Sequence, residues 1–510
     1  MKSPLPIKTM FTTTNVHTSA FAVLTTIILA TLTLVASSTA SLPPPPSAPS
    51  APAVPTLRLV NNTTVNARAH NFPNGDWGSS INGQTYQQEA LVSHRGYQYA
   101  AFYVAPGFPA VARRALPDGA WETITFKDYG PVTHSNTHNV IVIGIAPRDG
   151  TLHLSFDHHA TILRYRKSQP GVATNPTAHR WTPALFGPVT SALEPGKTIS
   201  RVTYPQFFTA PDGTLTFAFR NGVSGRGDWF LHEYTETNWT PLGQLFTQTG
   251  TYQGKNSRSA YPNPYRYDPD GRLHVTWSWR EHSSNLTGNH DLGYAWSDDH
   301  GRTWHNNNGI IIAHLTNTPT NDGATAAQPA SAISINTPGN IVYPIRYAWG
   351  MMNTTTQFVD AKRRVHIISW RNPDDAPAPS SNTLNSWRYY HYWRDIDGTW
   401  HERQLPFHGR KPQLVLDETG TMHVIHGTGP DLNYHGGDRG VHLAIATATE
   451  ASGWTDWKVS QPLPPDYIFQ GEPLLDVGRW EREKILSIYY QQKPEIPGNP
   501  ASLRVIDLRP

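Results

Sequence analysis

The chain has 510 residues and no cysteine, so disulfides, thiolate catalysis, zinc ribbons and iron–sulfur clusters are excluded. Charged residues make up 15% of the chain, against about a quarter in an average soluble protein, whereas 11% of the residues are aromatic. The formal net charge is +3 and no basic run concentrates it, so we do not expect nucleic acid as a partner.

The first 40 residues have the layout of a secretory signal peptide. Lys2 and Lys8 precede an uncharged stretch over 20–36, and small residues follow it up to Ala40. A signal anchor is the alternative, because the stretch is near the lower limit of about 17 residues for a membrane span. Five glycosylation sequons agree with an extracellular route: Asn61, Asn62, Asn238, Asn285 and Asn353.

A proline-rich segment over 41–56 follows the signal and is typical of an extended spacer without a core of its own. We therefore expect one folded domain over 57–510 in a secreted, extracellular glycoprotein. After cleavage of the signal the protein is expected to be a monomer that does not contact a membrane.

One unit recurs along the expected domain: an extended segment, a turn of the Asp-Gly type and an alternating strand. The copies lie at 143–159, 207–222, 265–280, 358–371 and 414–427. A tryptophan follows a later turn at six positions: Trp121, Trp181, Trp239, Trp304, Trp400 and Trp454. Spacings of about 60 residues suit four strands per unit, and radial repetition of such units makes a propeller.

The sequence thus predicts an all-β fold, a seven-bladed β-propeller of four-stranded antiparallel blades. Residues 57–63 are expected to join the last blade, and 316–340 to form an inserted loop. The segment 297–304 fits an Asp box, a folding motif in which Asp299 caps a turn. Four histidines share one repeated slot and are interpreted as packing residues: His153, His274, His366 and His423.

Candidate functional residues fall at two repeated positions of the predicted blades. In a propeller the inner strand of each blade starts, and the second strand ends, on one face around the channel. Inner-strand starts carry His138, Tyr204 and Tyr261. Second-strand ends carry Asp157, His158, His159, Arg220, Arg280, Arg371 and His426. These groups predict a cationic pocket with proton-transfer groups for an acidic ligand.

Several of these residues have a second interpretation. His134 and His138 have the spacing of a helical metal pair, but they precede a strand, so no metal site is predicted. No organic cofactor is expected, and a structural cation in the channel is left open. Asp157 is expected to orient a histidine or to cap a strand. Strand alternation aims only one of His158 and His159 at the pocket, and parity favours His159.

These residues resemble the BNR-repeat polysaccharide lyases, seven-bladed propellers that include ulvan lyases and fungal rhamnose-glucuronate lyases of the gum arabic type. The resemblance covers 77–510 and is carried by THNVIV (137–142), DGTLHLSFDHH (149–159), VTYPQF (202–207) and RNGVSGRGDW (220–229). It implies a catalytic set of His138, His159 or His158, Tyr204 and Arg220. On placement alone, we expect substrate contacts from Tyr261, Arg258, Arg280 and Arg371.

The resemblance implies β-elimination at a glucuronate, in which the C5 proton leaves once the adjacent carboxylate is neutralised. We expect Arg220 and His138 on the carboxylate. His159 or an ionised Tyr204 can act as the base, and the preferred assignment is His159 as base and Tyr204 as acid. The implied substrate is an acidic plant polysaccharide, arabinogalactan with a rhamnosyl-glucuronate cap, which releases rhamnose and keeps a 4,5-unsaturated glucuronyl end.

Two alternatives remain open at this stage. A propeller glycoside hydrolase acts on the same linkage without forming a double bond, and a non-catalytic propeller binds acidic glycans through arginines and aromatic rings. A sialidase also has this architecture, but it needs three arginines on one carboxylate, and the motif expected near the start is missing.

Overall fold

The computed structural model describes residues 55–76, 78–282, 288–316, 331–376, 387–429 and 440–510. The chain divides into Met1–Pro52 and Ala53–Pro510, and the described residues belong to the second unit. The expected signal peptide, nearly all of the spacer, part of the expected inserted loop and the sequon at Asn285 lie outside the described residues. Within the described ranges, no helix is long and apolar enough to cross a membrane.

The described residues form six hydrogen-bonded sheets. The largest holds, in order, β29 (Phe469–Leu475), β30 (Leu486–Gln492), β31 (Ala501–Arg509), β1 (Arg58–Ala69), β3 (Tyr97–Val104), β4 (Phe108–Ala115) and β5 (Glu122–Thr125), with β2 (Leu91–His94) beside β3. The next sheet along the chain holds β6 (Ile141–Ala146), β7 (Thr151–Phe156) and β9 (Tyr165–Lys167). A five-stranded sheet holds β13 (Asn238–Phe246), β12 (Arg226–Thr235), β11 (Leu215–Val223), β10 (Val202–Thr209) and β8 (His159–Thr161).

The remaining three sheets follow in chain order. A seven-stranded sheet holds β14 (Arg258–Pro262), β16 (Leu273–Glu281), β17 (Asn289–Ser297), β18 (Thr303–His305) and β19 (Ile311–His314), with β15 (Arg266–Tyr267) on β16 and β20 (Ile341–Tyr343) on β17. One four-stranded sheet holds β21 (Thr356–Val359), β22 (Val365–Arg371), β23 (Arg388–Arg394) and β24 (Trp400–Gln404). The other holds β25 (Gln413–Leu416), β26 (Met422–Thr428), β27 (His442–Ala448) and β28 (Lys458–Ser460). A short helix, α1 (Val477–Glu483), joins β29 to β30.

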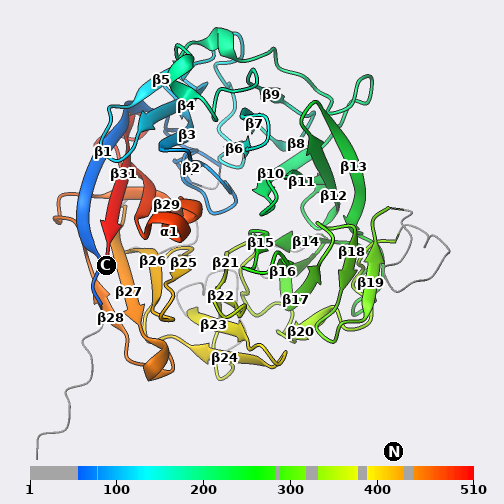
Figure 1. The fold of residues 1–510 in the computed structure, drawn as a ribbon. Coiled ribbons are helices and arrows are strands. Elements are labelled where there is room, and N and C mark those ends of the chain that lie inside the picture. The colour runs from blue at the N-terminus through cyan, green and yellow to red at the C-terminus, as the bar shows by residue number, and fades with distance from the viewer. Residues whose placement is uncertain (1–54, 77, 283–287, 317–330, 377–386, 430–439) are drawn as a thin grey trace, which may run out of the picture. The chain divides into compact units, whose positions relative to one another are not determined.

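The sheets of the second unit are arranged around a common centre as in a β-propeller, with β6, β10, β14, β21 and β25 innermost (Figure 1). Residues of β6, β21 and β25 are entirely buried, whereas β28 at the outer edge is mostly exposed. These inner strands are therefore covered on both faces, and β6 is accordingly a continuous apolar run, whereas β21 and β25 also bury polar residues.

The predicted count of seven four-stranded blades is wrong. Among the described residues, only two of the six sheets have four strands. Ala69 at the end of β1 pairs with both Ala501 of β31 and Val104 of β3, so strands from the start and the end of the domain merge into one eight-stranded sheet. In addition, β8 pairs with β10 instead of joining β7, which leaves the sheet of β6 with three strands.

The predicted closure by an early strand is confirmed. β1 pairs antiparallel with β31, from Arg58 opposite Arg509 to Ala69 opposite Ala501. A buried ion pair supports the junction, because the Arg114 guanidinium donates to the Asp507 carboxylate at 2.7 Å. Because β1 and β31 pair with each other, neither strand exposes an unpaired edge along this ladder.

The structure also tests three smaller predictions. Asp299 accepts backbone hydrogen bonds from Arg302 and Thr303 and so caps the Asp-box turn. The repeated histidines are buried, and their Nδ1 atoms bond to side chains of neighbouring strands, which confirms the packing role. The sequon at Asn353 is buried and its amide oxygen accepts from Lys411, so the folded chain hides it from glycosylation.

The close approach of β6 to β10 requires a glycine. Gly144 lies in β6, and a Cβ atom built on it would come within 2.6 Å of the Phe207 ring of β10. Real Cβ atoms do not tolerate such a distance, so only glycine lets the two inner strands pack at this spacing.

Replacing Gly144 with alanine is expected to lower the free energy of unfolding by about 1–3 kcal/mol, because the added methyl group forces β6 and β10 apart. Thermal unfolding followed by circular dichroism measures the change. Gly187→Ala is the matched control, since its Cβ would meet nothing nearer than 3.7 Å. Equal melting temperatures for the two variants would contradict this account.

Candidate active site

Four residues predicted from the sequence meet at one place. His138 precedes β6, His159 begins β8, Tyr204 lies in β10 and Arg220 lies in β11. The rings of His138 and His159 are stacked, with centroids 4.4 Å apart and planes at 7°. Tyr204 is 6.0 Å from His138 between ring centroids, and the Arg220 guanidinium carbon lies 4.7 Å from the Tyr204 ring centroid.

Backbone pairing creates this cluster. His159 on β8 and Arg220 on β11 pair with the same residue of β10, Thr203. The next residue, Tyr204, lies at a register shift and has a φ of +54°, a left-handed conformation that is unusual for a bulky side chain. Ala160, next to His159, has a φ of +56°. Such strained backbone gathers at functional sites, where the surrounding structure has to enforce it.

The Arg220 guanidinium is fully buried beneath the aromatic rings. Its Nη1 donates to the Tyr261 hydroxyl at 3.0 Å, whereas Nε and Nη2 have no hydrogen-bond partner among the residues that the structure describes. Nε and Nη2 form the edge of a guanidinium that binds a carboxylate with two parallel hydrogen bonds.

Tyr261 lies between two guanidinium groups. Burial alone would raise the pKa of its phenol, but Arg220, Arg280 and a hydrogen bond with Ser224 outweigh burial and lower the pKa to about 8. Tyr261 is 1% exposed, whereas Arg280 is partly exposed and offers a cation to solvent. A phenol in this setting holds negative charge far more readily than an ordinary tyrosine.

Two residues that the sequence interpretation missed complete the cluster. Tyr86 stacks on the other face of the His138 ring, with centroids 4.9 Å apart. The Lys411 ammonium lies 5.8 Å from the Tyr86 ring centroid and donates to Asn353. Lys411 stands two residues before β25, an inner-strand start, so the positional rule that selected His138 applies to it as well. Tyr86 lies in a loop before β2 and carries no such signal.

Both stacked imidazoles are held neutral near pH 7. Burial, His159 and the cations Arg220, Lys411 and Arg280 keep the pKa of His138 well below 6.5. Burial and Arg220 lower the pKa of His159 to about 4. A neutral imidazole has one nitrogen with a lone pair and one N–H, so it can accept a proton at one nitrogen and donate at the other. An imidazolium has no lone pair and cannot accept a proton.

His134 and Asp157 form a hydrogen-bonded pair next to the loop that carries His138. His134 Nε2 lies 2.6 Å from the Asp157 carboxylate, which also accepts from Asn139 and from the Tyr129 hydroxyl. These hydrogen bonds outweigh burial and keep the pKa of Asp157 low. Asp157 thus orients a histidine, as expected. No group of three or more His, Cys, Asp or Glu side chains suited to a metal ion is found among the described residues.

Three of the sequence candidates lie apart from the cluster. His158 is buried and its Nε2 contacts the Ser155 hydroxyl and the Arg164 backbone, so the structure brings His159 and not His158 to His138. Arg258 is fully buried in an ion pair with Glu281. Arg371 is held by carboxylates of its own sheet region. Neither arginine faces the four clustered residues, because ion pairing fixes each side chain elsewhere.

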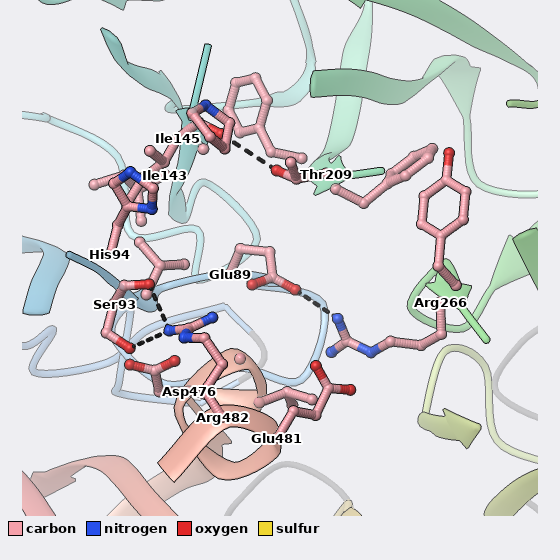
Figure 2. A pocket seen from close by; sticks show the side chains of 18 of the residues that line it. Glu89, Ser93, His94, Ile143, Ile145, Thr209, Arg266, Asp476, Glu481 and Arg482 are labelled. Carbon is pink, nitrogen blue, oxygen red and sulfur yellow. Dashed lines mark hydrogen bonds and ion pairs between the residues drawn. The ribbon is translucent and has the colours of Figure 1, made fainter. Parts of the chain in front are cut away.

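A separate cavity of about 270 Å³ lies at the opposite ends of the same inner strands (Figure 2). It is lined by the ends of β6 and β10 and by α1, and it contains a Glu89–Arg266 ion pair of 3.0 Å. Arg482 donates to Ser93 at its wall. None of the predicted site residues lines this cavity.

Comparison with known proteins supplies a family. Residues 97–408 match the family described as BNR repeat-containing family member. The long isoform of ulvan lyase from Pseudoalteromonas sp. (strain PLSV) is 28% identical over 286 residues, 48% of this chain and 26% of that protein. The short isoform from Alteromonas sp. (strain LOR) is 24% identical over 277 residues, 46% of this chain and 50% of that protein. The matched region is thus about a quarter and a half of these relatives' lengths.

Solved structures show the same fold. Polysaccharide lyase Uly1 superposes with a TM-score of 0.66 at 18% identity, covering 89% of this chain and 99% of that one. An ulvan lyase bound to -[GlcA(1-4)Rha3S]- gives a TM-score of 0.58 at 12% identity, covering 87% and 95%. At these identities the likeness establishes the fold alone.

One tyrosine is expected to ionise near pH 8, because Arg220 and Arg280 stabilise the Tyr261 phenolate. Titration of tyrosinate absorbance measures it, and the step should disappear in Tyr261→Phe. Arg280→Met should move the step to higher pH, since it removes a cation that favours the charged form. A step unchanged in both variants would assign the ionisation to another residue.

Proposed function

The chain belongs to the BNR repeat-containing family, and we propose that it is a polysaccharide lyase that cleaves a uronate-containing glycan by β-elimination. The observation that carries the proposal is the stacked, neutral pair His138 and His159 beside Tyr204 and Arg220. Binding alone needs no proton-transfer groups, whereas elimination needs a base, an acid and a cation together.

The charge distribution suits a carboxylate-bearing sugar. The guanidinium carbons of Arg220 and Arg280 lie 5.5 and 5.7 Å from the Tyr261 ring centroid, and the Lys411 ammonium also interacts electrostatically with Tyr261. As the C5 proton leaves a glucuronate, negative charge grows on the adjacent carboxylate. Cations fixed before the reaction stabilise that charge without further reorganisation.

The reaction balances with the groups at hand. An imidazole takes the C5 proton, the C5–H electron pair forms the C4–C5 double bond, and the C4–O4 bond breaks. The leaving oxygen takes a proton from the Tyr204 hydroxyl. Afterwards the protonated imidazole loses its proton to solvent and the Tyr204 phenolate takes one up from solvent, which restores both groups. Each step uses a group of the described cluster.

The proposed substrate is a rhamnosyl-glucuronate cap of plant arabinogalactan, as in gum arabic, with rhamnose released. One relative's structure contains a glucuronate linked to sulfated rhamnose, so a glucuronate–rhamnose polymer is the matching alternative. We further propose that the protein is secreted, in keeping with its expected N-terminal signal. Hydrolysis of the same linkage and binding without cleavage are outcomes of the assay that follows.

Purified protein incubated with gum arabic or ulvan is expected to generate the ultraviolet absorbance of a 4,5-unsaturated uronate, with free rhamnose from gum arabic. Tyr204→Phe and His138→Ala should each lower turnover by about 10²–10⁴-fold, the usual contribution of a proton-transfer group. Tyr97→Phe, a tyrosine of β3 outside the cluster, is the control. Released sugar without the absorbance would indicate hydrolysis, and binding without product would indicate a lectin-like propeller.

On the acid side, or acid limb, of the pH–rate profile, kcat/KM is expected to fall only below pH 6.5. An imidazole that acts as the base has to be unprotonated, and burial and the cations lower the pKa of His138. Lys411→Met removes one of these cations, so the pKa of His138 should rise and the limb should move to higher pH. A pH–rate profile of both proteins tests this shift. A limb that moves to lower pH, or not at all, would contradict the electrostatic account.

A further inference from the structure

The loop before β6 contains an amide that contacts both stacked imidazoles. Asn136 lies two residues before His138, and its side chain reaches His138 on one side and His159 on the other. The backbone N–H of His138 donates to Asn136 Oδ1 at 2.9 Å, which fixes this side of the amide as the oxygen. The other side is therefore the NH₂ group.

The amide assigns a different tautomer to each ring. Asn136 Oδ1 lies 3.1 Å from His138 Nδ1, and an oxygen without a proton bonds there only if Nδ1 carries hydrogen. Asn136 Nδ2 lies 2.7 Å from His159 Nδ1, and an NH₂ group bonds there only if Nδ1 offers a lone pair. A neutral imidazole carries one N–H. His138 thus has its lone pair on Nε2, and His159 has its proton on Nε2.

A second layer of contacts holds the amide itself. The backbone N–H of Asn136 donates to His134 Nδ1 at 3.1 Å, and His134 Nε2 lies 2.6 Å from the Asp157 carboxylate. Asp76 pairs with the same loop, through its backbone N–H on the Ser135 carbonyl. The position of Asn136 is therefore determined by its own loop and by two other segments, at Asp76 and Asp157.

We propose that Asn136 is a positioning residue that makes His138 the proton acceptor of the site and His159 a hydrogen-bond donor to the substrate. This inference rests on the proposed function for its chemical meaning, and it reverses the roles expected from the sequence. His138 Nε2 then takes the C5 proton, and His159 Nε2–H donates a hydrogen bond to the substrate carboxylate. Tyr204 remains the acid for the leaving oxygen.

Asn136→Asp isolates the effect, because it keeps an acceptor for His138 and removes the donor to His159. A carboxylate next to His159 favours a proton on Nδ1 of that ring, so both rings would carry hydrogen on Nδ1. We expect kcat to fall at least tenfold with a smaller change in KM. The acid limb should move to higher pH, since the new negative charge raises the pKa of both imidazoles.

The tautomers are measured directly by two-dimensional ¹H–¹⁵N spectra of the histidine rings in the full chain, assigned with His138→Gln and His159→Gln. The wild type should show Nδ1–H on His138 and Nε2–H on His159. Asn307→Asp is the matched control. Its amide likewise accepts from Arg394 and Trp400 and donates to Gly398, away from the cluster, so kcat and both ring signals should stay unchanged.

The same proton position on both wild-type rings would overturn the inference, as would an Asn136→Asp variant with wild-type kcat and pH profile. The two proposals fail separately. Wild-type protein that forms no unsaturated product but shows opposite tautomers would refute the lyase assignment and leave the role of Asn136 intact.

Discussion

The pairing of β8 with β10 is the constraint on which the site depends. A three-residue strand leaves the sheet of β6 and bonds to the next sheet, so that His159 and Arg220 share Thr203 as a partner. The detour costs favourable backbone geometry at Ala160 and Tyr204, both at positive φ. In return, His159, Tyr204 and Arg220 of one sheet lie beside His138, which precedes the neighbouring sheet.

The charges around the cluster affect its phenol and its imidazoles differently. The cations lower the pKa of a phenol, Tyr261, which becomes easier to ionise, and they lower the pKa of the imidazoles, which become harder to protonate. The cations lower both pKa values, whereas burial lowers the pKa of His138 and by itself would raise the pKa of Tyr261. A site of this kind is neutral in its proton-transfer groups and positive in its surroundings, which suits an anionic substrate that has to lose a proton.

Sequence reasoning placed the four central residues because their positions follow a topological rule: inner-strand starts and second-strand ends share a face. The same rule covers Lys411, whereas Tyr86 and Asn136 lie in loops, where no periodicity predicts a side-chain direction. Arg258 and Arg371 lie at positions that the rule selects, but nearby carboxylates hold both side chains in ion pairs, so they do not join the cluster. The rule locates a region, and local pairing decides which side chains are available.

The all-β class, the repeated turns, the closing strand β1 and the candidate residues His138, His159, Tyr204 and Arg220 followed from the sequence, since turn chemistry, strand alternation and family motifs are local properties. The number and size of the sheets did not, because a single pairing of Ala69 with Val104 joins β3 to a sheet built with strands from the end of the domain. Nor did the proton positions on His138 and His159. Those depend on one amide held by His134 and on long-range burial, and only the folded chain brings these groups within hydrogen-bonding distance.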